Sequence, residues 1–386
     1  MSTLEILFWS CLILVLYTYA GYPLLLSIFA KMKKPQSVGF ENDDELPKVS
    51  LIIACYNEAS ILREKVSNTL ALDYPKDKLE ILFITDGSND GSEFLLKEIE
   101  GIKVLHQAER RGKTAAMNRA VEQSNGEILV FTDANTFLPS QALRKLIAPF
   151  ADALTGCVAG EKRVRKDNQG ESVGSGEGLY WKYESFLKKM DARLCSATGA
   201  AGELFAIRGS LWEAIDSKII LDDFYASLRV VEKGYRIAYT PDAYAEEDAS
   251  VDMKDEWKRK IRIASGGFQS MFLLGGLFSF KRFVFTWQYV SHRLLRWTIT
   301  PLAMLVLIPL NALLLGEHWI YDVLLYAQIG FYLLAFGGYF AEKMQRRVKA
   351  FFLPYYFTFM HAAALIGGVR YFTGKQSSIW EKAKRA

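Results

Sequence analysis

The stretch Glu127-Ile-Leu-Val-Phe-Thr-Asp133-Ala-Asn135 predicts the fold more directly than any other part of the chain. Its centre is a run of β-forming residues, which indicates a buried strand, and a carboxylate and an amide follow at the end of that run. In an open α/β sheet, ligands bind at the carboxyl ends of the strands, so Asp133 and Asn135 would lie at a binding edge. Taken alone, the stretch also fits a strand whose final Asp caps the next helix.

Two earlier segments have the same design. Residues 49–54 form a hydrophobic run followed by Tyr56-Asn57-Glu58, and residues 79–85 form another run followed by Asp86-Gly-Ser. Because parallel strands of such a domain end at one edge of the sheet, three polar strand ends predict a common site.

The same region alternates strand and helix patterns, as doubly wound α/β domains do. After about residue 150 the alternation weakens, and glycine-rich stretches around 170–178 and 199–202 predict loops. The expected strands are residues 48–54, 79–85, 103–106, 127–132 and 204–208, and the expected helices are 58–70, 92–99, 114–123 and 223–233, the last ending at Gly234.

The composition predicts membrane segments beside a water-soluble domain. The chain is 51% hydrophobic yet 23% charged, so its apolar residues must be concentrated in particular segments. Residues 6–30, 297–316, 323–341 and 350–369 carry no Asp, Glu, Lys or Arg, and each is about long enough to cross a bilayer. We therefore expect a transmembrane anchor at 1–34, a cytoplasmic domain at 35–255, amphipathic interfacial helices at 256–292, and a C-terminal region at 293–386 with about three membrane segments and a basic tail.

Basic residues beside the apolar segments predict the orientation in the membrane. Lysines at 31, 33 and 34 follow the first segment, and Lys281 and Arg282 precede the second. They place the soluble domain in the cytoplasm and make the protein a multi-pass protein of the plasma (inner) membrane. A complete last span would put the basic tail, with Arg370 and Lys375, outside. Either the tail is an exception to the rule or one segment does not cross.

The sequence also argues against several kinds of chemistry. The four cysteines, at 11, 55, 157 and 195, have no metal-ligand spacing, so a zinc site is not expected. The formal charge is only +4 and the basic residues gather beside membrane segments, so no nucleic-acid partner is expected. Gly112-Lys113 is similar to the end of a P-loop, but Gln107 stands where that motif requires glycine.

The polar strand ends suit a nucleotide or a phosphorylated sugar. The turn at Asp86 offers hydrogen-bond acceptors for a sugar or a base, and Lys113 at a helix start would attract phosphate. Asp133 can ligate a divalent cation whose shell is completed by diphosphate oxygens. Each residue also has a plainer interpretation, as a tight turn or as a solvated lysine.

Taken in order, these residues resemble the nucleotide-sugar-binding signatures of family 2 glycosyltransferases. The signatures are Tyr56-Asn57-Glu58, Asp86-Gly-Ser, Gly112-Lys113 and Asp133-Ala-Asn135, followed by an acceptor-side region with Asp222-Asp223. The resemblance runs from about residue 48 to residue 270, and the flanking membrane segments are similar to those of the polymer-forming membrane synthases of the family. It implies an α/β domain of GT-A type, Rossmann-like and nucleotide-sugar-binding, embedded between transmembrane helices.

The resemblance implies a role for each residue. Asp223, beside Asp222, would be the catalytic general base that removes a proton from an acceptor hydroxyl during a single inverting displacement. Asp133 would bind a Mg²⁺ or Mn²⁺ ion that bridges to the diphosphate. The UDP-sugar itself would be bound by Tyr56, Asn57, Glu58, Asp86, Lys113, Asp133, Asn135 and Arg262.

The chain departs from the family pattern in ways that affect these roles. Asn135 stands where a second acid of the metal motif is usual, and it supplies no charge. The Gln-x-x-Arg-Trp signature of processive synthases is missing, and the corresponding stretch is Arg259-Lys-Ile-Arg262-Ile263. A similar stretch, Arg293-Leu-Leu-Arg-Trp297, lacks the Gln and lies at a membrane entry, so we interpret it as a coincidence.

The helix expected around residues 257–268 has an apolar face and a basic face. Trp257, Ile261, Ala264 and Phe268 share the apolar face. This pattern favours a helix lying in the membrane interface, with Arg259 or Arg262 near both lipid phosphate and the nucleotide diphosphate. The alternative is a basic helix packed on the soluble domain.

Two classes of function fit the sequence. The first is an inverting hexosyl or N-acetylhexosaminyl transferase that uses a UDP-sugar and extends a glycan, as in exopolysaccharide synthesis with synthase or export partners, or that makes a single transfer to a lipid. The second is a non-catalytic, nucleotide-binding scaffold subunit of a synthase complex. The presence of Asp86, Asp133 and Asp223 together favours the enzyme.

Overall fold

A computed structural model describes residues 1–34, 39–165, 175–248, 253–344 and 348–378. The strands form one mixed sheet in the order β3-β2-β1-β4-β7-β6-β8-β5. They are β1 (Val49–Cys55), β2 (Leu79–Asp86), β3 (Lys103–Gln107), β4 (Ile128–Asp133), β5 (Thr136–Phe137), β6 (Thr155–Val164), β7 (Leu204–Arg208) and β8 (Arg236–Glu247).

The helices divide between the soluble domain and the apolar segments. Those of the soluble domain are α3 (Ala59–Leu70), α4 (Ser92–Lys97), α5 (Lys113–Glu122), α6 (Ala142–Ile147), α7 (Ser175–Leu194), α8 (Asp222–Glu232) and α9 (Met253–Leu273). The others are α1 (Thr3–Leu16), α2 (Tyr22–Lys31), α10 (Phe283–Tyr289), α11 (Leu295–Trp297), α12 (Ile299–Leu313), α13 (Trp319–Lys343) and α14 (Lys349–Phe372).

The first half of the domain is the predicted doubly wound unit. Strands β3, β2, β1 and β4 are parallel, so the ends of β1, β2 and β4 meet at one edge. Apolar side chains cover both faces: Leu62 of α3 and Leu146 of α6 lie in the core on one side, and Met117 of α5 and Leu228 of α8 lie in the core on the other. This sandwich is the GT-A-type architecture that the sequence resemblance implied.

The second half contains strands that the sequence pattern did not predict. β6 and β8 pair in parallel with each other, and β7 joins β6 to β4 with antiparallel pairing. β6 includes Gly156 and Gly160, which obscure a strand pattern but are needed for packing, because a Cβ at Gly156 would lie 2.5 Å from a methyl carbon of Val230. Tertiary contact therefore determines this strand more than local preference does.

The loop expected around residues 170–178 is partly wrong. α7 already begins at Ser175, while residues 166–174 lie outside the described residues. A glycine costs a helix only about 1 kcal/mol, and the apolar residues that follow bury the helix against α2 and the sheet. The loop expected at 199–202 and the helix end at Gly234, where φ is +95°, are confirmed.

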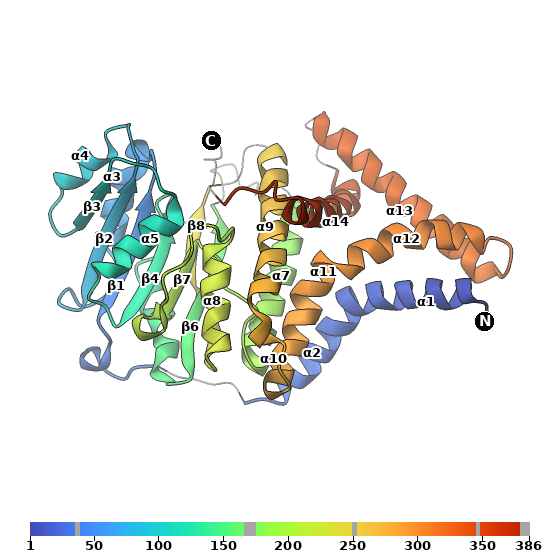
Figure 1. The fold of residues 1–386 in the computed structure, drawn as a ribbon, viewed down its shortest axis with the longest axis horizontal. Coiled ribbons are helices and arrows are strands. Elements are labelled where there is room, and N and C mark those ends of the chain that lie inside the picture. Colours follow the sequence, from blue (N-terminus) through green and yellow to red (C-terminus); the bar gives the residue numbers. More distant parts are fainter. Residues whose placement is uncertain (35–38, 166–174, 249–252, 345–347, 379–386) are drawn as a thin grey trace.

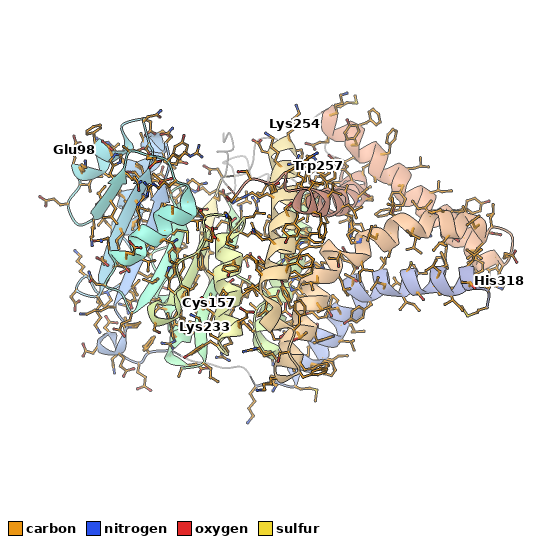
Figure 2. All side chains as sticks on the ribbon, in the orientation of Figure 1. Glu98, Cys157, Lys233, Lys254, Trp257 and His318 are labelled. Carbon is orange, nitrogen blue, oxygen red and sulfur yellow. The ribbon has the colours of Figure 1, made fainter. Side chains whose placement is uncertain are left out.

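The apolar segments form long helices to one side of the domain. Residues 3–31, 319–343 and 350–372 are each long and apolar enough to cross a membrane, and residues 280–297 with 299–313 form a fourth candidate that is bent by 50°. Figure 1 shows α1, α12 and α13 extending away from the sheet, with α7 and α9 between them and the sheet. His318, at the turn between α12 and α13, lies at the end of the molecule farthest from the sheet (Figure 2).

The apolar face of α9 packs on α14. The ring of Trp257 lies 4.9 Å from that of Phe359, and Phe268 contacts the rings of Tyr371 and Phe372 (Trp257 is labelled in Figure 2). A protein helix therefore covers the apolar face of α9 at Trp257 and Phe268, and the interfacial position of this helix stays a prediction. The basic side chains of α9 face the soluble domain, as described below.

The α9–α14 contact provides a test of this packing. Gly367 of α14 touches α9 so closely that a Cβ would lie 2.5 Å from that of Ala264 and 2.8 Å from the carbonyl oxygen of Ile261. We expect Gly367→Ala to destabilise the protein by about 1–3 kcal/mol and to lower its apparent Tm in detergent by several degrees. Gly330→Ala in α13 is the matched control, since nothing lies within 4 Å of that position. Equal Tm values for the two variants would contradict this packing.

Candidate active site

A cavity of about 810 Å³ opens at the edge where β1, β2 and β4 end, and it continues between α7, α9 and α14. The structure brings nearly all of the predicted residues to its wall. Those lining it are Tyr56, Glu58, Asp86, Lys113, Asp133, Asn135, Asp222, Asp223 and Arg262. Asn57 is not among the lining residues.

Asp222 and Asp223 begin α8, where free N–H groups favour carboxylates. The Asp223 N–H donates to Oδ1 of Asp222 over 3.0 Å, and the Phe224 N–H donates to Oδ1 of Asp223 over 2.8 Å. Burial and the neighbouring charge of Asp222 raise the pKa of Asp223 to about 7, while Lys113 opposes the rise. A carboxyl group with this pKa is suited to exchange a proton near neutral pH.

Lys113 is the first residue of α5 and lies among the carboxylates. Its Nζ donates to Oδ1 of Asp133 over 2.5 Å. Although burial opposes its charge, Asp133 and Asp222 raise the pKa of Lys113 above the usual value. The partly exposed ammonium is therefore held in its charged form by the acids that it compensates.

Gly202, in the loop before β7, leaves room for Lys113 and Asp223 to lie close to the same point. A Cβ at this position would lie 3.1 Å from Oδ2 of Asp223 and 3.2 Å from Nζ of Lys113. Only a residue without a side chain leaves both groups where they are. The glycine-rich stretch at 199–202 thus has a role in the site.

At the end of the cavity near β1 and β2, groups of the protein already bind the carboxylate of Asp86. Oδ2 of Asp86 accepts the N–H groups of Arg111 and Gly112 over 3.0 and 2.6 Å, and Arg119 lies 3.3 Å from Oδ1. Asp86 thereby fixes the loop that leads to α5, in addition to lining the cavity. The guanidinium of Arg110 lies over the ring of Tyr56, 3.9 Å from its centroid.

Asn57 lies at the end of β1 and contacts the turn after β2. It adopts a left-handed conformation, with φ of 53°, and its side-chain oxygen accepts the N–H of Asn89 over 2.9 Å. It therefore holds the turn after β2 against the end of β1. Tyr56 and Glu58, on either side of it, line the cavity.

Asn135 is oriented by an acid from another strand. Its Nδ2 donates to Oε1 of Glu247, at the end of β8, over 3.1 Å. Glu247 also pairs with Lys162, which lies 3.0 Å from Glu203. An Asp at position 135 would face the carboxylate of Glu247, which is a physical reason for the amide.

Arg262 reaches the same region from α9. Its Nη2 donates to the carbonyl oxygen of Ile220 over 2.7 Å, just before Asp222 and Asp223. Burial lowers the pKa of Arg262 while Asp222, Asp223 and Asp133 oppose this effect. Arg259 also lines the cavity and lies 3.8 Å from Glu256. The basic face of α9 thus points into the site.

The stretch Arg293-Leu-Leu-Arg-Trp297, whose likeness to the processive signature we interpret as a coincidence, nevertheless lies at the cavity. Arg293, Arg296 and Trp297 all line the cavity. The ring of Trp297 lies 5.6 Å from that of Phe224, the residue after Asp223, and it covers Gly267 of α9. This stretch is far from the other motifs in the sequence, and only the fold places α11 beside α8. The sequence pattern therefore did not identify it as part of the site.

A buried carboxylate that no pattern predicted holds this stretch in place. Glu184 of α7 pairs with Arg296, with Arg293 at 3.4 Å and with His292 at 3.3 Å. His292 in turn lies 2.5 Å from Asp191 of α7. The pairing joins the soluble domain to the helices that lead into the apolar segments.

Comparison with known proteins agrees with this geometry. Residues 50–214 match the family model of glycosyl transferase family 2. The chain is 30% identical over 239 residues to a poly-beta-1,6-N-acetyl-D-glucosamine synthase of Staphylococcus aureus, covering 58% of this chain and 56% of that protein. It is 28% identical over 262 residues to the probable glycosyltransferase YdaM of Bacillus subtilis, covering 63% and 60%.

A solved structure supports the fold over nearly the whole chain. A mannosyltransferase from Pyrobaculum calidifontis, in complex with GDP-Man and Mn²⁺, superposes with a TM-score of 0.71 at 24% identity, covering 96% of this chain and 100% of that one. The edge of polar strand ends and the mixed sheet are those of an α/β domain of GT-A type. The chain therefore contains a glycosyl transferase family 2 domain.

The charges around Asp223 predict two opposite pKa changes. Asp222→Asn removes a like charge and should lower the pKa of Asp223 by about one unit, whereas Lys113→Met removes an opposite charge and should raise it. Carbon-13 NMR of aspartate-labelled protein across pH 4–9 (roughly the range that brackets ordinary and raised carboxyl values) would follow the titration. Shifts of the same sign in both variants would contradict the arrangement.

Proposed function

We propose that the protein is an inverting glycosyltransferase that moves a hexose or N-acetylhexosamine from a UDP-sugar to a hydroxyl group of an acceptor at a membrane. The observation that carries the proposal is the meeting of Asp223, Lys113 and Asp133 around Gly202 at the strand ends. A proton acceptor and a cation beside a phosphate-binding edge are the two groups that such a displacement needs.

The geometry supports a single displacement. The acceptor oxygen would form a bond to the anomeric carbon, the bond from that carbon to the diphosphate oxygen would break, and the acceptor proton would pass to Asp223. Lys113 and Arg262 would compensate the charge that develops on the diphosphate. Asp222 would act on Asp223, because its charge keeps the pKa of the base near neutral.

The residues fit a divalent cation with few protein ligands. Asp133 offers a partly exposed carboxylate, with one oxygen on Lys113, and the Asn135 side chain lies two residues away on the cavity wall. Among the described residues no three His, Cys, Asp or Glu side chains converge as a metal cage. Mg²⁺ or Mn²⁺ held by Asp133 and completed by diphosphate oxygens is the arrangement that this donor set supports. Bound there, the ion would stabilise the negative charge of the leaving diphosphate.

Similarity supports the donor class in part. The Staphylococcus aureus relative is named a poly-beta-1,6-N-acetyl-D-glucosamine synthase, which favours UDP-N-acetylglucosamine or UDP-glucose as the first donors to test. This chain spans between one half and two thirds of the length of that relative and of the Bacillus subtilis one. The proposals of polymer formation, of exopolysaccharide synthesis and of export partners therefore rest on a partial match.

Location in the plasma (inner) membrane, with the domain in the cytoplasm, completes the proposal. The helices that are apolar enough to span a bilayer lie on one side of the domain, away from the sheet (Figure 1). Lysines at 31 and 33 end the first of them near the domain, as expected for a cytoplasmic side. Cytoplasmic UDP-sugars would then reach the strand edge directly.

Turnover of a donor panel tests the proposal. Purified protein with Mn²⁺ should release UDP from at least one UDP-sugar when an acceptor is present, and Asp223→Asn should reduce kcat by at least about a hundredfold, because general-base catalysis contributes that much. Thermal shifts should show that the variant still binds UDP. No UDP release from any donor, with UDP binding retained, would instead support the scaffold subunit.

Gly202→Ala tests the convergence of the site. The added methyl group would displace Asp223 or Lys113 by a few tenths of an ångström, and we expect kcat to fall about tenfold with little loss of stability. Gly275→Ala is the control, because nothing lies within 4 Å of that glycine. Unchanged kcat in Gly202→Ala would argue against a shared role for the two side chains.

A further inference from the structure

The side-chain amide of Asn135 has one end bound by the protein and one end open. Its Nδ2 donates to Oε1 of Glu247 over 3.1 Å. Among the described residues no group donates a hydrogen bond to its Oδ1, and this oxygen is not fully buried in the cavity wall that the residue forms. An amide that only held the fold together would usually have both ends satisfied by protein groups. The open oxygen is therefore available to a ligand.

The backbone that carries Asn135 is held from several sides. It lies in the turn between β4 and β5, where the hydroxyl of Thr136 donates to the carbonyl oxygen of Asp133 over 2.9 Å. Nζ of the buried Lys65 donates to the carbonyl oxygen of Thr136 over 2.5 Å. Because the turn is fixed, the partner of the Asn135 amide decides where Oδ1 lies.

Strand pairing places Glu247 beside this turn. β5 and β8 are antiparallel, with Thr136 opposite Glu247 and Phe137 opposite Glu246. Side chains alternate along a strand, so Glu246 and Glu247 point to opposite faces of the sheet, and Glu247 is the one that contacts Asn135. The sequence offers two adjacent glutamates, and the fold selects one of them.

Glu247 is itself held by Lys162 of β6. Its Oε1 accepts Nδ2 of Asn135 and its Oε2 pairs with Nζ of Lys162, so its two oxygens have different partners. Lys162 also donates to Oε1 of Glu203 over 3.0 Å. The side chains of Glu247 and Lys162 are both buried. Removing either would leave a charge without its partner in a poorly solvated place, which favours a fixed geometry for the pair.

A carboxylate admits only one orientation of the neighbouring amide. It accepts hydrogen bonds and cannot donate them, so Glu247 attracts the NH₂ group of Asn135 and repels its oxygen. Oδ1 is thereby turned away from Glu247, on the cavity wall where Asp133 also lies. The negative charge that a second acid would carry at position 135 is located instead on Glu247, next to Lys162.

We propose that Glu247, held by Lys162, is a positioning residue for donor binding: it fixes the Asn135 amide so that Oδ1 accepts an electropositive group of the bound donor. That group is the divalent cation or a hydroxyl hydrogen of the sugar. The inference rests on the proposed function, because it concerns how the UDP-sugar is oriented. It adds a residue of β8 and a residue of β6 to the strand-end motifs.

Exchanging the acid and the amide tests the proposal. Asn135→Asp brings two carboxylates together and should raise the dissociation constant for UDP-N-acetylglucosamine with Mn²⁺ by roughly tenfold, measured by calorimetry on the full chain in detergent. When Glu247→Gln is added, the new amide can donate to the new acid, and affinity should recover by at least about fivefold, as expected for coupled neighbours. Unchanged affinity in Asn135→Asp, or no recovery in the double variant, would overturn the proposal.

The adjacent glutamate provides the matched control. Asn135→Asp combined with Glu246→Gln removes the same charge from the other face of β8, and it should bind as weakly as Asn135→Asp alone. Equal recovery in both double variants would reduce the effect to net charge and overturn the positioning role.

The kinetics of Glu247→Gln separate positioning from a merely structural role. A glutamine can offer its oxygen or its NH₂ group to Asn135, so both orientations of that amide become available. We expect KM for the donor to rise by roughly twofold or more, since only one orientation is competent, while KM for the acceptor and the Tm stay unchanged. Equal changes in both KM values, in step with a lower Tm, would contradict the proposal.

UDP without a sugar identifies the group that Oδ1 meets. Asn135→Ala removes this oxygen. Weaker binding of UDP with Mn²⁺ would assign Oδ1 to the cation, and a loss that appears only with the sugar attached would assign it to a hydroxyl group. A loss with neither ligand would overturn the proposal.

These affinities need no turnover, so the inference and the proposed function can fail separately. If the Asn135 and Glu247 substitutions are coupled in binding but no donor is turned over, the positioning role stands and the transferase is wrong. If sugar is transferred but the substitutions are not coupled, the positioning role is wrong and the transferase stands.

Discussion

The site depends on the compensation of crowded carboxylates by one ammonium group, that of Lys113. Asp133, Asp222 and Asp223 converge from a strand end and a helix start, and Lys113 lies among them, 2.5 Å from Asp133. Without the lysine, these acids would repel one another in a setting that solvates them poorly. With it, Asp223 keeps a pKa near 7 and the strand edge keeps a positive charge. Gly202 permits the approach that this balance requires.

The helix α9 connects this cluster to the apolar helices. One face directs Arg262 toward the carboxylates and the other packs on α14, so the strand edge and the wall formed by α14 belong to one cavity. Glu184 provides a second connection, since it pairs α7 with Arg293 and Arg296. Buried pairs of this kind are costly to break when one partner is removed, which favours a fixed relation between the two parts.

Much of the domain followed from local patterns. The parallel strands, the helices between them, the polar strand ends and the acids at the start of α8 are all short-range features, and each lies where it was predicted. The features that the sequence pattern did not predict have one cause. β6, with its glycines, and the stretch at Arg293 owe their places to partners more than a hundred residues away or to close packing that no local pattern records. Asn57 likewise serves a turn that only the pairing of β1 with β2 creates.

The sequence by itself determined the fold class, the order of the polar strand ends and the presence of long apolar helices, because hydrophobic periodicity and strand-end chemistry are properties of neighbouring residues. Only the tertiary structure decided which charges meet. It placed Lys113 between Asp133 and Asp223, turned Asn135 toward Glu247, brought Trp297 beside Phe224, and covered the apolar face of α9 with α14. Electrostatic and packing interactions act through space over a few ångströms, so residues distant in the chain contribute to them as strongly as adjacent ones.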